Sequence, residues 1–272
     1  MPRWVSLAVS GSILLVLLVL VLGAPEHLSQ QDLDLAYASP RQLLPFGADS
    51  RGRPLLEYAQ QGARVVALPA LVAGALVTLA ATVGGVVRCI GSEAVNTWIQ
   101  GVSEVLGALP RMLVILVAAL VLPMDSRGLL PLAVTWALLA APGAMDEAAA
   151  TAERLGGARF VEALRAHGYS AARIFGYHVV LLNLRPVVVR QGAEVTMQVV
   201  FLEIALSYLA LADDQPSFTH PDSMRSWADL LNLGYPSLVL DVPSGHALAL
   251  GLGLVGMVAI MALSLGHAAR GR

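Results

Sequence analysis

The sequence predicts an all-α protein, a polytopic membrane helix bundle with six transmembrane helices. Of its 272 residues, 57% are hydrophobic and only 13% are charged, and the mean hydropathy is +0.70. These values lie outside the range of ordinary soluble domains. The hydrophobic residues also gather into runs of about the ~20 residues with which a helix crosses a ~30 Å hydrocarbon core. Polar segments separate the runs, so the chain is expected to cross the membrane repeatedly.

The composition excludes several classes of function. Cys89 is the only cysteine, so the sequence provides neither an intrachain disulfide nor a cysteine metal cluster. Every basic side chain is an arginine, and a P-loop ATPase needs a lysine that reaches the nucleotide phosphates. ATP hydrolysis of that kind would therefore require another chain. A net charge of -2 and the lack of a basic tract give no support to a nucleic-acid partner.

The first apolar run, Trp4 to Gly23, has the length of a span. Its basic start at Arg3 also fits a cleaved signal peptide, although the apolar stretch is longer than a usual signal core. The proline-rich segment 24–64, acidic in its first part, is expected to lie outside the membrane. Val65 to Val87 follows as the second span. Small residues within it allow close helix packing, and these are Gly74, Gly84 and Gly85.

The next two spans are expected over Leu106 to Leu122 and over Leu129 to Met145, with Pro142-Gly143 ending the fourth helix. Arg111 falls within the third run. It is either a functional intramembrane charge, or it reaches the inner interface and the span begins after it.

The fifth span, Pro186 to Leu211, carries three charges in an otherwise apolar helix. Arg190 and Glu194 lie four residues apart and can pair on one face. Glu203 has no partner in its own helix, so it faces a bundle interior or water-filled path, or lies at the outer rim as a packing carboxylate. The sixth span is expected over Ala247 to Leu265. Six spans place both termini in the cytoplasm.

A polar segment, about residues 146–185, separates the fourth and fifth spans. It is rich in arginine, the signal of a cytoplasmic loop. Its pattern predicts a helix that begins at Arg159, a turn at Gly168, and a second, short helix that Ser170 caps and that ends near Phe175. Tyr169 and Ile174 are placed to close a hydrophobic staple across that cap.

This segment resembles the EAA loop of ABC importer permeases, which docks into the ATPase subunits of the transporter. The resemblance rests on Glu162-Ala163, on Gly168 five residues later, and on Ile174 and His178. Leu181 stands where the family usually has a proline, and Pro186 falls at a later proline position.

Four further stretches are similar to the dipeptide, oligopeptide and nickel branch of these permeases. Gly47, Asp49, Gly52 and Arg53 match its G-T-D-x-x-G-R-D element, apart from Ala48 and Pro54. The stretch FLEIALSYLAL, which contains Glu203, is similar to a pattern in its fifth span, and Pro142-Gly143 and Ser226-Trp227 match other short motifs of the branch.

The resemblance implies the type I ABC importer permease fold, with an N-terminal span and external segment (1–64) and a five-span core (65–272). It implies a permease subunit that takes up peptides or related small solutes, that is not an enzyme, and that binds no metal or cofactor, because partner ATPases hold ATP and magnesium. The implied partners are a second permease, two ATPases, a solute-binding protein and the lipid bilayer of the bacterial inner membrane. The residues implied in ATPase coupling are Glu162, Ala163, Gly168, Tyr169, Ser170, Arg173, Ile174, Phe175 and His178. Arg190, Glu194 and Glu203 are candidates for the translocation path.

Two alternatives stay open: a self-sufficient secondary transporter, and an ABC importer of nickel or another solute that is not a peptide. The sequence identifies neither the solute nor whether the two ATPases are alike. A membrane-embedded enzyme is disfavoured, because the histidines lie in predicted loops or at span ends.

Overall fold

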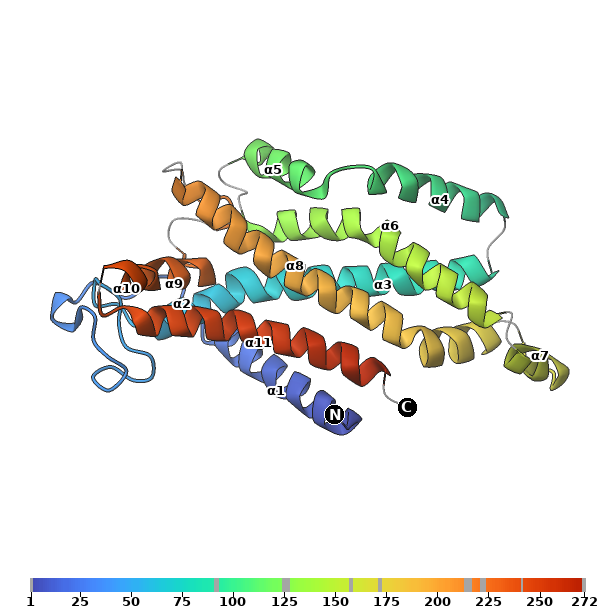
Figure 1. Cartoon of the computed structure of the whole chain (residues 1–272), viewed down its shortest axis with the longest axis horizontal. Helices are drawn as coiled ribbons and strands as arrows, with labels where there is room; N and C mark the ends of the chain where they lie inside the picture. Colours follow the sequence, from blue (N-terminus) through green and yellow to red (C-terminus); the bar gives the residue numbers. More distant parts are fainter. Residues whose placement is uncertain are drawn as a thin grey trace.

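The computed structural model describes residues 2–90, 93–123, 128–156, 159–170, 173–212, 217–220, 224–240 and 242–270. In these residues the regular structure is helical, apart from one isolated β-bridge between Ala48 and Pro54. Five helices are long and apolar enough to cross a membrane, or six if a bent pair forms one span. The all-α prediction is confirmed, and the architecture is that of a polytopic membrane helix bundle (Figure 1).

The long helices follow the predicted apolar runs closely at the first, fifth and sixth spans. The α-helices are α1 (Arg3–Leu22), α2 (Leu55–Gly62), α3 (Leu68–Ile90), α4 (Glu93–Gly107), α5 (Arg111–Val121), α6 (Leu129–Gly156), α7 (Arg159–Ala166), α8 (Arg185–Ala212), α9 (Trp227–Gly234), α10 (Pro236–Val239) and α11 (Gly245–Arg270). A short 3₁₀ turn covers Leu33–Leu35, and wide π-helical turns cover Ala63–Ala67 and Arg173–Leu184.

The core lies where α3 packs against α6 and α8. Small residues make this close approach possible, as predicted for Gly74. A Cβ added to Gly74 would lie 2.6 Å from the carbonyl oxygen of Gly192 on α8, and a Cβ on Gly192 would lie 2.6 Å from that of Gly74. Glycine therefore lets the two helix backbones pack directly on each other.

The second span begins earlier than predicted. α2, the wide turn and α3 form one helix, and its membrane-length part runs from Leu55 to Val87. The boundary predicted between residues 64 and 65 therefore lies inside a helix. Each wide turn is followed closely by a proline, Pro69 or Pro186. A proline inside a helix lacks an N–H and crowds the carbonyl four residues before it, and a wider turn relieves that contact.

The third span predicted over Leu106 to Leu122 is not one continuous helix. α4 and α5 are separate helices with a bend of 75° between them. The 11 residues of α5 cover only about 16 Å, too short to cross a bilayer alone. Pro110 stands in extended backbone at the break and precedes the first residue of α5.

The prediction that Pro142-Gly143 ends the fourth helix is also wrong, because α6 continues through Pro142 to Gly156. Buried alanines line the core face of α6 on both sides of the proline, among them Ala140, Ala144 and Ala148. This packing holds the helix together although one backbone hydrogen bond is lost.

The two ends of the bundle differ (Figure 1). Segment 24–54, α2, α9 and α10 gather at one end, which we call the α9 end. α7 lies at the opposite end of the bundle, beyond the last turns of α6. We call this end the α7 end. The start of α1 lies beside the last turns of α11, because Ser6 and His267 line the same groove.

Candidate functional site

The element that contains Gly47, Asp49, Gly52 and Arg53 is a loop, which we call the Asp49 loop, folded around the carboxylate of Asp49. This side chain is buried. Its Oδ1 accepts hydrogen bonds from the backbone N–H groups of Arg51 and Arg53, each at 2.8 Å, and its Oδ2 accepts one from the Tyr58 hydroxyl at 2.7 Å. The carboxylate thus joins the loop to the first turn of α2, which gives Asp49 a structural role that the sequence alone did not define.

The two glycines of the element are required by the same loop. Gly47 and Gly52 have φ angles of +84° and +73°, a region that favours glycine. A Cβ at Gly52 would lie 1.6 Å from the carbonyl oxygen of Asp32, and one at Gly47 would lie 2.3 Å from that of Ala38. The spacing of the element therefore reflects a turn pressed against the preceding chain.

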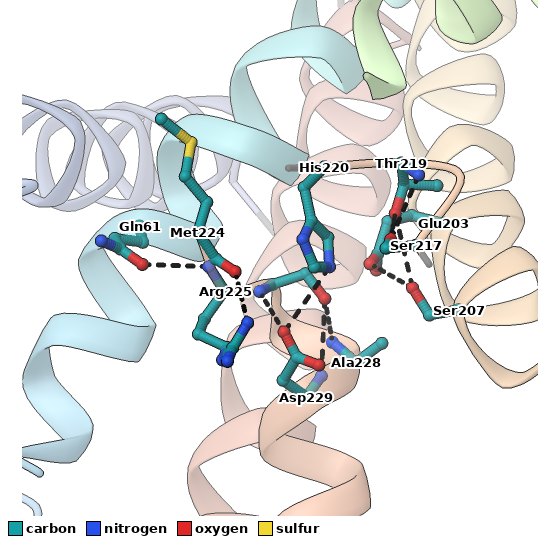
Figure 2. A network of polar contacts seen from close by, with 11 residues as sticks. Gln61, Glu203, Ser207, Ser217, Thr219, His220, Met224, Arg225, Ala228 and Asp229 are labelled. Carbon is teal, nitrogen blue, oxygen red and sulfur yellow. Dashed lines mark hydrogen bonds and ion pairs between the residues drawn. The ribbon is translucent and has the colours of Figure 1, made fainter. Parts of the chain in front are cut away.

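Glu203 is fully buried near the α9 end of α8 (Figure 2). One carboxylate oxygen, Oε1, accepts a hydrogen bond from the Ser207 hydroxyl at 2.9 Å. The Ser207 hydroxyl lies 3.5 Å from that of Thr219, which in turn lies 3.1 Å from that of Ser217. Glu203 thus faces the interior of the bundle, where a row of hydroxyl groups connects it to segment 217–220.

The start of α9 is fixed by a reciprocal cap. The Ser226 hydroxyl accepts hydrogen bonds from the N–H groups of Ala228 and Asp229, and Asp229 accepts one from the N–H of Ser226. This is a capping box, and its S-x-x-D pattern is visible in the sequence. The buried His220 ring lies 3.6 Å from the carboxylate of Asp229 (Figure 2). Asp222, its neighbour in sequence, lies outside the described residues.

Two contacts dock α9 and the residues just before it on α2. The Trp227 indole N–H donates to the carbonyl oxygen of Ala59 at 3.2 Å, and the backbone N–H of Arg225 donates to Gln61 Oε1 at 2.9 Å. Trp227 is fully buried. Sequence reasoning missed these pairs, since only the packing of α9 on α2 brings them together.

The Asp49 loop and the end of α8 meet at one cavity of about 520 Å³. Its lining includes Asp49, Arg53, Tyr58, Ser207, His220 and Asp229. The stretches identified separately in the first and last thirds of the sequence therefore form a single site at the α9 end. In the part of the chain that the structure describes, no three histidine, cysteine or acidic side chains form a group suited to a metal ion.

The predicted glycine turn is present at the α7 end. Gly168 has a φ of +79°. The N–H of Tyr169 donates to the carbonyl of Leu164, and that of Gly168 donates to the carbonyl of Arg165. This pattern is a Schellman motif, which ends α7 and reverses the chain.

Ser170 caps the next helix as predicted. Its hydroxyl accepts a hydrogen bond from the N–H of Arg173 at 3.4 Å. Tyr169 packs under the guanidinium of Arg173 and edge-on to the ring of His178, with centroid distances of 4.9 and 5.9 Å. The Tyr169 ring thus contacts Arg173 and His178, and Ile174 is buried. The staple between Tyr169 and Ile174 stays a prediction.

The prediction of a separate short helix that ends near Phe175 is wrong. The wide-turned segment Arg173–Leu184 continues without a break into α8. We call residues 159–170 and 173–178 the elbow. On α7 Val161 is buried, while Glu162 and Ala163 are exposed, as is every residue from Arg165 to Ser170. The elbow therefore presents a surface that the described chain leaves uncovered.

The predicted pairing of Arg190 with Glu194 is wrong. Arg190 forms its ion pair with Glu147 on α6, and Glu194 accepts a hydrogen bond from Gln198 at 3.4 Å. Gln198 in turn accepts one from the Trp136 indole at 3.0 Å. These groups follow one side of α8, where Arg190 and Glu194 are exposed.

Arg111 adds to this polar row. It lines a small cavity with Gln191, Glu194 and Gln198, and its guanidinium lies beside Gly143 of α6. The side chain is thus directed toward other helices of the bundle.

No protein family matches this sequence, and the search of curated proteins gave no significant match.

Proposed function

We propose that this chain is the permease subunit of an ATP-driven importer of peptides or related small solutes. In this proposal a second permease completes the path, two ATPases dock at the α7 end, and a solute-binding protein delivers the solute at the α9 end. The membrane is the bacterial inner membrane, with both termini in the cytoplasm. The observation that carries the proposal is the elbow, a reversed and capped turn that projects from one end of a membrane-length bundle.

The continuity of the helix supports a lever function for the elbow. Because Arg173–Leu184 runs on into α8, displacement of the elbow would move the helix that carries Glu203 at its other end. Packed helices shift as rigid units, and such movement of one bundle against another is the usual basis of alternating access. The chain would thus transmit motion, while the partner ATPases carry out the chemistry.

The polar row on α8 supports a shared path. Arg190 and Glu194 are exposed on a helix of membrane length. Charged groups in such a position are costly in hydrocarbon, so they face protein or a water-filled cavity. A second permease packed on this side would enclose the row as one wall of the path.

Cross-linking tests the docking partner. In a Cys89→Ser background, a cysteine at Ala166, exposed in the elbow, should cross-link to an ATPase subunit in native membranes. A cysteine at Leu22, which is 77% exposed at the end of α1 nearer the α9 end, is the matched control. If both positions or neither capture a protein with a P-loop, the proposal is wrong.

The turn itself is tested by Gly168→Val. A Cβ at Gly168 meets nothing within 4 Å, so the change acts on the backbone, where a β-branched residue at φ +79° is strained by about 1–2 kcal/mol or more. We expect solute uptake in membrane vesicles to fall while ATPase activity and membrane insertion persist. Gly168→Asn, which tolerates this backbone region, should retain uptake. Equal uptake by the valine variant and the wild type would contradict the lever function.

A further inference from the structure

Some residues that line the cavity at the α9 end carry polar atoms for which the protein supplies no hydrogen-bond partner. Three lining residues each have a buried polar atom without a hydrogen-bond partner: Nε of Arg53, Nδ2 of Asn232 and Oγ of Ser244. Ser244 is only 5% exposed. A buried donor left unpaired is costly, so such groups normally meet a bound molecule or ordered water.

Both carboxylates of the same cavity already have partners. Asp49 accepts hydrogen bonds from Arg51, Arg53 and Tyr58. Asp229 accepts one from the N–H of Ser226 and lies against His220. Of the three unpartnered atoms in the described lining, Arg53 Nε and Asn232 Nδ2 can only donate, which favours a molecule that supplies an acceptor.

The charge of the lining favours a monoanion. The described residues of the lining include three arginines and two aspartates, which leaves these side chains one net positive charge without His220. A carboxylate carries one negative charge, and its planar oxygens match the side of a guanidinium that includes Nε. A phosphate dianion would exceed the available charge and would face both aspartates.

We propose that this cavity binds a small carboxylate-bearing molecule, whose carboxylate accepts hydrogen bonds from Arg53, Asn232 and Ser244. Its volume of about 520 Å³ is in the range of small-molecule sites. Tyr37 and Arg51 in the lining are exposed, so the cavity reaches the surface. The proposal goes beyond the transport function and does not depend on docking of ATPases.

Binding is tested with the purified full-length chain in lipid nanodiscs, by calorimetry, with N-acetylglycine and with its neutral amide as the matched probe. We expect saturable binding of the carboxylate and none of the amide. Inorganic phosphate at equal ionic strength should compete weakly. If neither probe binds, or if both bind equally, water fills the site and the proposal is wrong.

Three variants locate the binding. Ser244→Ala removes an unpartnered hydroxyl and should weaken carboxylate binding about fivefold to tenfold without lowering the melting temperature. Asn232→Asp is nearly isosteric and introduces a negative charge, so binding should fall by more than about tenfold. Ser217→Ala is the control, because that cavity hydroxyl already bonds to Thr219. Unchanged binding by the first two variants would overturn the assignment even if the carboxylate binds.

Discussion

The carboxylate of Asp49 offers the sharpest test of how the loop at the α9 end is held. Asp49→Ala removes the acceptor of three hydrogen bonds, from the N–H groups of Arg51 and Arg53 and from the Tyr58 hydroxyl. Two of these bonds are partly buried, and the third is buried. We assign about 1 kcal/mol to each backbone bond and about 2 kcal/mol to the buried hydroxyl. Local opening of the loop should thus become easier by about 4 kcal/mol.

Asp49→Asn separates charge from hydrogen bonding. Both backbone N–H groups donate to Oδ1, and asparagine keeps an oxygen there. The Tyr58 hydroxyl can rotate to accept from the new amide instead. We therefore expect a cost of only about 1 kcal/mol, from loss of the charge-assisted part of the bonds.

Hydrogen–deuterium exchange of the full-length chain in nanodiscs measures these effects. Peptides that cover residues 47–58 should exchange at least a hundredfold faster in Asp49→Ala and within about tenfold of wild type in Asp49→Asn, since about 1.4 kcal/mol corresponds to tenfold. Peptides from α11 serve as an internal control. Equal exchange in the alanine variant and wild type, or equal effects of the two substitutions, would refute the role of Asp49. A uniform rise in α11 would show global destabilisation instead.

Two further predictions concern the membrane-length helices. Gly192→Ala places a Cβ 2.6 Å from the carbonyl oxygen of Gly74, so α3 and α8 must separate and thermal unfolding in nanodiscs should occur at a lower temperature. Gly253→Ala meets nothing within 4 Å and should not have this effect; equal melting of the two variants would contradict the close approach. Glu147→Gln removes the ion pair with Arg190, and because these side chains are 39% and 44% exposed, the free energy of unfolding should fall by less than about 1 kcal/mol. If the free energy of unfolding fell by more than about 2 kcal/mol, the ion pair would be much less screened by solvent than the exposed fractions of its side chains indicate.

Hydropathy was sufficient to place most spans, but it did not predict whether a proline within an apolar run breaks the helix. Pro110 and Pro142 both interrupt apolar runs, yet the chain bends at the first and remains helical at the second. At Pro142 the buried alanines of α6 pack on both sides of the missing hydrogen bond. Tertiary packing therefore determines whether the helix continues through the proline, and this packing cannot be predicted from the pattern of a single sequence.

The site was predictable in its parts and not in its assembly. Residue type and spacing singled out Asp49 and Glu203, because a carboxylate between turn glycines or within an apolar helix stands out. Their partners did not stand out. Tyr58 and Ser207 are ordinary residues of amphipathic and apolar stretches, and only the folded bundle brings Asp49 and Ser207 to the same cavity.

The uninterrupted helix from Leu55 to Val87 has a mechanical consequence. Its 33 residues extend for about 50 Å, whereas the hydrocarbon layer is about 30 Å thick. Roughly 20 Å of this helix must then extend beyond the lipid tails. The extending part bears Tyr58 and Gln61. If this helix tilts within the bilayer, the end that bears Tyr58 moves sideways together with the loop and helix docked on it, and one wall of the α9-end cavity moves with them.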